Sequence, residues 1–365
     1  MTTSLTDRVG HLPKPQPDVQ RIKTALSHGQ PDRVPLAELA IAEEVMAELG
    51  GPLPPLPANP TGQQLREWAQ ARVGLWWRLG YDYYRVRVEI PFTVDRLPAV
   101  DTANAQNQRQ WVNEHDGIIH TLADVERYTW PGRADMGLSQ AEAALACLPE
   151  GMGAIGFSGG VLEWTTALMG LERFMMCLYD EPELARTVVD RVGAAILQGF
   201  ELLCEMDAIF ALWLGDDMGF KTATLASPEH LREYILPWHK RYAELAHRTG
   251  RLFLLHSCGH VEAIMPDLIA DVGIDAKHSF EDVIMPVEEF HRRWGGKVGV
   301  MGGVDVDLLS RKSEEEVRER TLQILEACAP AGGYSCGSGN SVTNYVPARN
   351  YLAMVETVHR FNGRL

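Results

Sequence analysis

The amino-acid sequence predicts a single (β/α)8 barrel, an α/β fold in which eight parallel strands are enclosed by helices. The chain has 365 residues, of which 45% are hydrophobic and 23% charged, as expected for a folded globular chain of this size. Short runs rich in Val, Ile, Leu and aromatic residues also alternate with long helical patterns. That alternation is typical of a parallel sheet that is buried on both faces.

Eight runs qualify as strands, and they lie at 34–41, 83–89, 153–157, 208–215, 251–258, 274–281, 297–302 and 333–337. Helical patterns occupy the stretches between them. The pattern at 171–204 is interrupted by Pro182, and the pattern at 228–248 begins where Ser227 can cap a helix and Pro228 suits its first position. Eight strand and helix pairs are the number that closes such a barrel.

Two segments stand apart from the barrel pattern. Residues 1–30 contain several prolines and one short helical pattern, so we expect an N-terminal helical arm on the surface. Residues from about 91 to 131 are expected to form an insertion, in which 111–120 alternates like a β-hairpin with its turn at the Asp-Gly pair 116–117. No repeat or flexible linker divides the remainder, so residues 31–365 are expected to form one barrel domain.

The charge of the chain excludes some partners. Lys and Arg total 34 against 49 Asp and Glu, a net charge of −15, which repels nucleic acid and anionic membrane surfaces. Neither a signal peptide nor a run of about 18 apolar residues is present. Six cysteines in so long a chain are too few for a disulfide framework, so a cytoplasmic location with reduced thiols is expected.

A candidate metal site begins where the fifth predicted strand ends, in the sequence HSCG at 256–259. The carboxyl ends of barrel strands form the catalytic face, and side chains two apart on a strand point the same way. His256 and Cys258 can therefore converge on one ion, and their donor types suit Zn²⁺. Cys336, at the end of the last predicted strand, is the expected third ligand, and Glu281, at the end of the sixth, is a candidate for the fourth.

Ordinary packing is the alternative explanation for such residues, because Cys is often a small buried hydrophobe. A second Cys at an equivalent strand end, inside a glycine-rich loop, favours the metal interpretation for the pair. The remaining thiols lie among apolar helical residues and are expected to be packing residues: Cys147, Cys177, Cys204 and Cys328. His260 and His278 are expected at a helix end or on the surface.

Other polar residues lie at predicted strand ends. Asp216 and Asp217 end the fourth strand and are candidates for orienting substrate or transferring a proton, although capping a turn is an equal alternative. Glu38 lies just inside the first strand, either as a buried carboxylate or at the barrel mouth. Residues after Cys336 are candidates for lining the substrate pocket, although Asn is also an ordinary turn residue: Asn340, Asn344 and Tyr345.

A longer pattern resembles the uroporphyrinogen decarboxylase-like superfamily, whose fold is the same eightfold barrel. The resemblance spans nearly the whole chain and is carried by RIKTALSHGQPDRVPLAE at 21–38, GDDMG at 215–219, LHSCG at 255–259, GVMGGVD at 299–305 and GGYSCGSGN at 332–340. Within it, a His-x-Cys with a distant Cys resembles the zinc site of the corrinoid-dependent methyltransferases, such as methylcobalamin:coenzyme M methyltransferase. It is also similar to the site of cobalamin-independent methionine synthase.

This resemblance implies a zinc-dependent methyltransferase with His256, Cys258 and Cys336 as ligands and Glu281 in a comparable place. It also implies that a partner protein carries a methylcorrinoid. The methyl group would pass between this corrinoid and a small molecule, which is either a thiol acceptor or a methyl-ether donor, and the direction of transfer stays open.

Two alternatives to the methyltransferase are retained. One is a metal-free decarboxylase in which Asp216 or Asp217 holds pyrrole nitrogens. The sequence departs from that pattern, because no Lys or Arg lies between Arg33 and Arg66 and the glutamates there would repel a polyanionic porphyrinogen. The other alternative is a non-catalytic binding protein that handles zinc or a corrinoid.

Overall fold

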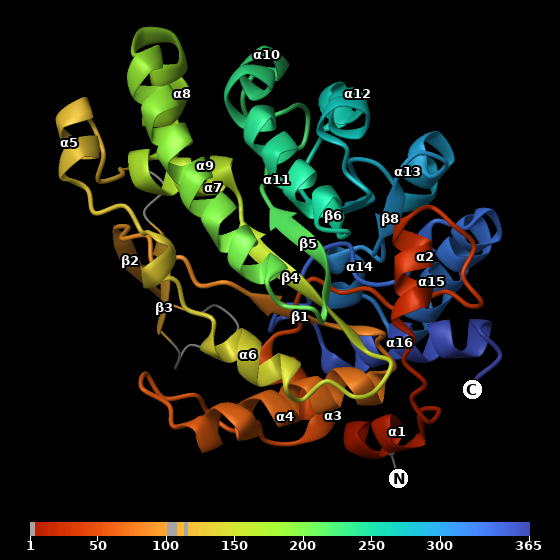
Figure 1. Ribbon diagram of the computed structural model, residues 1–365. Coiled ribbons are helices and arrows are strands. Elements are labelled where there is room, and N and C mark those ends of the chain that lie inside the picture. The colour runs from red at the N-terminus through yellow and green to blue at the C-terminus, as the bar shows by residue number, and fades with distance from the viewer. Residues whose placement is uncertain (1–3, 101–107, 113–115) are drawn as a thin grey trace.

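The computed structural model describes residues 4–100, 108–112 and 116–365, and it contains one curled parallel sheet surrounded by helices (Figure 1). Seven strands form this sheet in the order β1 (Tyr83–Arg87), β4 (Gly153–Gly159), β5 (Ile209–Gly215), β6 (Leu252–His256), β7 (Ala276–His278), β8 (Gly299–Met301) and β9 (Tyr334–Ser335). Every neighbouring pair is parallel. The predicted α/β class is confirmed, and the architecture is TIM-barrel-like.

The predicted first strand, 34–41, is not a regular strand. Isolated parallel bridges join it to the chain at and after the end of β9, and it contacts β1 through a side chain. The Tyr83 hydroxyl donates to the Glu38 carbonyl at 2.7 Å and accepts from the Glu38 backbone N–H at 2.8 Å. Pro35 has no N–H to donate, which is one reason why a continuous ladder does not form here. The segment nevertheless occupies the eighth position, between β9 and β1.

The helices lie on the outside of the sheet (Figure 1). They are α3 (Glu43–Gly50), α4 (Gly62–Leu79), α5 (Leu122–Arg127), α6 (Ser139–Leu145), α7 (Val161–Met169), α8 (Leu171–Asp180), α9 (Pro182–Cys204), α10 (Pro228–His230), α11 (Leu236–Arg248), α12 (Met265–Asp267), α13 (Val287–Trp294), α14 (Val306–Arg311), α15 (Glu314–Cys328) and α16 (Ala348–Phe361). None of the helices that the structure describes is long and apolar enough to cross a membrane.

Prolines shape two of these helical stretches. The predicted break at Pro182 separates α8 from α9. In the predicted helix 228–248, a π-helical turn at Leu231–Ile235 separates α10 from α11. Pro237, the second residue of α11, lacks the N–H that a regular α-helix would use, which explains the irregular turn.

The N-terminal segment forms two helices, α1 (Leu5–His11) and α2 (Val19–Leu26). The expected surface position is wrong for α2, because Ile22 and Leu26 are fully buried against β8 and β9. Gly299, at the start of β8, allows this contact: a Cβ there would lie 2.5 Å from the Leu26 carbonyl oxygen. The helix therefore closes the amino end of the barrel.

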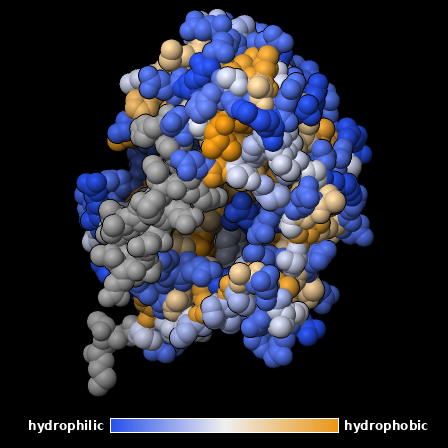
Figure 2. All heavy atoms as spheres, turned by 90° about the vertical axis from the view of Figure 1, so that its left-hand side faces the viewer, coloured by the Kyte–Doolittle hydropathy of each residue, from blue (hydrophilic) through white to orange (hydrophobic). Residues whose placement is uncertain are grey.

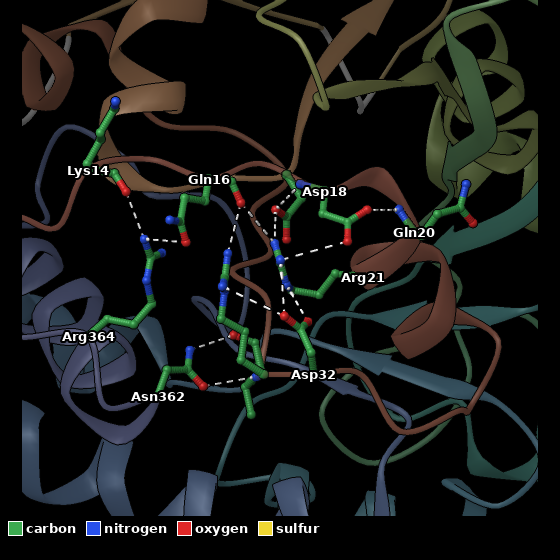
Figure 3. A network of polar contacts seen from close by, with 11 residues as sticks. Lys14, Gln16, Asp18, Gln20, Arg21, Asp32, Asn362 and Arg364 are labelled. Carbon is green, nitrogen blue, oxygen red and sulfur yellow. Dashed lines mark hydrogen bonds and ion pairs between the residues drawn. The ribbon is translucent and has the colours of Figure 1, made fainter.

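A polar network holds this segment beneath the barrel (Figure 3). The buried Arg21 guanidinium forms ion pairs with Asp32 at 2.6 Å and Asp82 at 2.5 Å, and it also donates to the Gln16 carbonyl at 3.3 Å. Burial alone would lower the pKa of Arg21, but the carboxylates of Asp32 and Asp82 raise it. Arg364 adds a bond from the C-terminal end to the Lys14 carbonyl.

Between residues 91 and 131, β2 (Arg96–Val100) and β3 (Gln108–Val112) form a separate antiparallel pair. The hairpin predicted over 111–120 is not confirmed, because residues 113–115 lie outside the described part of the chain, and Trp111 and Val112 pair with β2. Gly117 serves close packing instead, since a Cβ there would lie 2.2 Å from the Leu168 carbonyl oxygen of α7. The Ile118 N–H donates to that same carbonyl at 2.7 Å.

Candidate metal centre

The candidate site lies where β5 and β6 end. Gly215 pairs in register with His256, so Asp217 and Cys258, two residues further along each strand direction, come to the same level. In Figure 1, β2 and β3 lie on the left, and β4 and β5 run toward that side. Figure 2 shows the molecule from this side. A hollow opens near the centre of this face, with hydrophilic and hydrophobic atoms at its edge.

Three different donor atoms converge at this level. The ligand atoms of Asp217, His256 and Cys258 all lie within 4.8 Å of one another. His256 Nε2 is 3.5 Å from Asp217 Oδ1 and 3.4 Å from Cys258 Sγ. Zinc bonds to oxygen, nitrogen and sulfur are about 2.0–2.3 Å long, so one ion fits among these three atoms with small adjustments.

Cys336 does not join this cluster. Its neighbour Ser335 pairs with Met301 at the level of His256 and faces the barrel interior, so Cys336, one residue later, faces the surrounding helices. The fully buried Cys336 thiol interacts with the Tyr334 hydroxyl and lies near Cys328 of α15, and burial raises its pKa to about 12. The expected third ligand therefore points away from the site.

Glu281 is also outside the cluster. The strand β7 ends at His278, and Glu281 lies beyond it in the connection that leads to α13. There it lines a cavity of about 500 Å³ together with Asn340 and Tyr345. This position suits contact with a ligand rather than with the three clustered donor atoms.

The Cys258 sulfur accepts hydrogen bonds from two neighbouring loops. The Asn340 side-chain amide donates to it at 3.1 Å and the Ser279 hydroxyl at 3.3 Å. The Cys258 backbone N–H in turn donates to Asp217 Oδ1 at 2.8 Å. Burial, followed by repulsion from Asp217, raises the pKa of Cys258 to about 12. A bound cation would reverse this balance and favour the thiolate.

His256 is held in the form that binds metals. A hydrogen bond joins its Nδ1 to His278 Nδ1 at 2.7 Å, which leaves Nε2 directed toward the cluster. Burial lowers the pKa of His256 to about 4, although Asp217 opposes the shift, so the imidazole is neutral at pH 7. His278 was expected at a helix end or on the surface, and that expectation is wrong: it is fully buried on the neighbouring strand.

Glu38 supports the site from the opposite side of the barrel. Its fully buried carboxylate accepts hydrogen bonds from the Ser338 backbone N–H at 2.8 Å and the Ser338 hydroxyl at 2.5 Å. Burial raises the pKa of Glu38 to about 8, despite these bonds. The contact anchors the loop that carries Asn340, so Glu38 is a buried carboxylate rather than a residue at the mouth.

The two aspartates at the end of β5 have different environments. Asp216 is fully buried, bonds His239 Nε2 at 2.7 Å, and accepts from the backbone N–H groups of Leu162 and Glu163 at the start of α7. It therefore caps the start of α7, which precedes β5 in the chain, rather than the turn that follows β5. Asp217, whose side chain is 37% exposed, belongs to the cluster.

Three more polar residues lie at the carboxyl end of the barrel. Tyr345 is 56% exposed beside Asn340, and Asn344 is partly buried in the same loop. Glu163, which the sequence did not single out, lies near Asp216 and Asp217. Desolvation, followed by repulsion from these two carboxylates, raises the pKa of Glu163 well above its usual range.

Comparison with known proteins places this geometry in context. A methylated-thiol–coenzyme M methyltransferase of Methanosarcina mazei is 29% identical over 189 residues, which are 52% of this chain and about half (48%) of that relative. A uroporphyrinogen decarboxylase of Cupriavidus pinatubonensis is 26% identical over 271 residues, 68% of this chain and 70% of the relative.

A solved structure described as a methyltransferase from Methanosarcina mazei has the same fold, with a TM-score of 0.68 at 16% identity over 99% of both chains. The family model described as uroporphyrinogen decarboxylase (URO-D) matches residues 114–361. Because that match covers well over half of the chain, the protein belongs to the uroporphyrinogen decarboxylase family.

Proposed function

We propose that the protein is a zinc-dependent methyltransferase that moves a methyl group between a corrinoid carried by a partner protein and a small molecule. The observation that carries the proposal is the convergence of an oxygen, a nitrogen and a sulfur donor at the carboxyl ends of β5 and β6. The methyltransferase relative from Methanosarcina mazei supports the same reaction class.

Asp217, His256 and Cys258 would hold the zinc, and three protein ligands leave a position free for substrate. Zinc supplies a Lewis acid there, which lowers the pKa of a substrate thiol or polarises the oxygen of a methyl ether. This ligand set replaces the one expected from sequence, because Cys336 faces the helices and Glu281 lies outside the cluster.

The chain's own residues prepare the site. His278 fixes the ring of His256, while Asn340 and Ser279 donate to the Cys258 sulfur and so favour its ionised form. Glu163, whose pKa is raised by desolvation and by the carboxylates of Asp216 and Asp217, would protonate a leaving oxygen if the substrate is an ether.

Elemental analysis of purified variants tests the ligand set. We expect about one zinc per chain in the wild type and in Cys336→Ala, and loss of zinc and turnover in Cys258→Ala and Asp217→Ala. Cys336→Ala is the matched control, since it removes a buried thiol outside the cluster. Zinc retained at full stoichiometry in Cys258→Ala, or lost in Cys336→Ala, would contradict this assignment.

The metal-free decarboxylase remains a second candidate, because the Cupriavidus pinatubonensis decarboxylase aligns over 68% of this chain. The structure weakens one part of it: Asp216 is engaged with His239 and the start of α7, so its carboxylate is not free to hold pyrrole nitrogens. Carbon dioxide release from uroporphyrinogen in the presence of a chelator would support the decarboxylase and contradict our proposal.

A non-catalytic zinc protein is the third candidate. Structural zinc sites are closed by four protein ligands, whereas the cluster offers three. X-ray absorption at the zinc edge distinguishes a closed structural site from an open catalytic site. A sulfur count that rises when a thiol is added supports the catalytic site with a thiol acceptor.

A further inference from the structure

One strand of the barrel presents arginines to the interior. Arg87 of β1 pairs with Phe157 of β4, which pairs with Trp213 of β5, so these side chains and that of Arg85 share one face of the sheet. The Trp213 ring contacts His278 with a centroid distance of 5.2 Å, which identifies this face as the interior that also contains the metal cluster.

Arg85 has an aromatic neighbour but no acceptor. Its guanidinium lies over the Phe157 ring, 4.6 Å from the centroid. Within the described part of the chain, it forms neither a hydrogen bond nor an ion pair. Stacking on a ring occupies the face of a guanidinium and leaves its five N–H groups, which lie in the plane, free to donate.

This arrangement is costly unless a ligand completes it. Buried polar groups are almost always hydrogen-bonded, and a largely buried cation without a partner destabilises a protein. Burial, with a smaller effect of Arg87, lowers the pKa of Arg85 to about 10, so the group is still charged at neutral pH. Arg87 is exposed on the same face, nearer the rim.

Arg85 faces the same interior as the cluster. Trp213, on its face of the sheet, contacts His278, whose Nδ1 bonds His256 Nδ1 at 2.7 Å. Lys277 is already satisfied, since its ammonium donates to the carbonyls of Ser257, His278 and Ser279. Within the described part of the chain, Arg85 is therefore the more deeply placed cation of this face with N–H groups available to a ligand.

We propose that Arg85 binds a single anionic group, a carboxylate or a sulfonate, on the small substrate. The planar fork of a guanidinium matches such oxyanions with paired hydrogen bonds. Arg85 is the more buried of the two arginines on this face, and a single arginine in the interior suits a substrate with one acidic group rather than the many carboxylates of a porphyrinogen. We also infer that the other end of the substrate binds at Asp217, His256 and Cys258, and this part rests on the proposed function.

Binding of unreactive anions tests Arg85 separately from the methyl transfer. Benzoate and ethanesulfonate carry neither a thiol nor a methyl ether, so their binding can be measured by calorimetry on the full chain, with zinc and after chelation. We expect at least one of them to bind the wild type, and Arg85→Met to weaken that binding by about 10-fold to 100-fold. Which probe binds distinguishes a carboxylate substrate from a sulfonate.

Two further variants exclude simpler explanations. Arg311→Met is the matched control, because it removes a mouth cation that is exposed and already paired with Asp307. Arg85→Lys keeps the charge without the fork and should bind with intermediate affinity. Arg85→Met should also melt at the same temperature as the wild type or higher, because it removes an unpaired charge, whereas a structural role predicts a lower value.

Equal affinities in the wild type and Arg85→Met, or equal losses in Arg85→Met and Arg311→Met, would overturn the proposal. Failure of both probes to bind the wild type would also overturn it. Loss of anion binding in Arg85→Met while zinc is retained supports it, and this result does not depend on whether methyl transfer is the reaction.

Discussion

Two arginines, one at each end of the barrel, are buried in different ways. Arg21, at the amino end, is surrounded by acceptors from Asp32, Asp82 and Gln16. Arg85, in the interior near the carboxyl end, has an aromatic ring beneath it and no acceptor within the described residues. The first arrangement stabilises the fold, whereas the second leaves hydrogen-bonding capacity for a ligand.

A left-handed backbone occurs at both ends, since His28, which follows α2 at the amino end, has a φ of 49°. At the carboxyl end, Ser279 adopts a φ of 86°, in the left-handed region that disfavours residues with a side chain. This conformation accompanies the hydrogen bond from the Ser279 hydroxyl to Cys258 Sγ. Strain of this kind collects at functional sites, where the surrounding structure maintains it.

The largest expected difference is in stability. Arg21→Met leaves the buried Asp82 without its cation and should lower the free energy of unfolding by about 3–5 kcal/mol. Arg85→Met should not measurably lower the free energy of unfolding. Urea denaturation measures the free energy of unfolding of both variants. Similar decreases in both would show that the two arginines do not differ in their contribution to stability.

Substitutions at the carboxyl end should weaken zinc binding, whereas substitutions at the amino end should not. Asn340→Ala removes a donor to the Cys258 sulfur and should weaken zinc binding by about 10-fold to 100-fold. Competition with a zinc chelator measures the change. Gln16→Ala, in the network at the amino end, is the control and should bind zinc as the wild type does.

The pH dependence of stability should report Glu38. Its folded-state pKa is raised from 4.5 to about 8, so between these values the folded chain holds a proton that the unfolded chain has lost. The free energy of unfolding should therefore fall as pH rises through this window, by roughly 1.4 kcal/mol per pH unit from this group. Glu38→Gln should remove that fall, and an unchanged slope in denaturation curves would contradict the assignment.

The smallest expected effect concerns Ser279. Ser279→Gly and Ser279→Ala both remove the hydroxyl, but glycine alone adopts a φ of 86° without strain. The glycine variant should be more stable than the alanine variant by about 1 kcal/mol. Equal stabilities by thermal unfolding would show that this residue carries no strain.

The sequence predicted that His256 and Cys258 converge, but not that Asp217 joins them as the third member of the cluster. His256 and Cys258 were predicted because two residues of one strand lie on one face whatever the strand's neighbours are. Cys336 was misplaced because the face of a residue depends on register, and one residue's difference reverses it. Asp217 was expected in a catalytic role and His278 in none, since their proximity to His256 depends on pairing between strands.

The sequence by itself determined the alternation of strands and helices, the net charge and the break at Pro182. Local patterns determine these features, because periodicity and backbone restrictions act over a few residues. The tertiary structure alone decided that Asp217 joins His256 and Cys258, that α2 closes the barrel, and that Arg85 has no acceptor. These depend on strand register and on long-range packing, which bring together side chains that are distant in sequence.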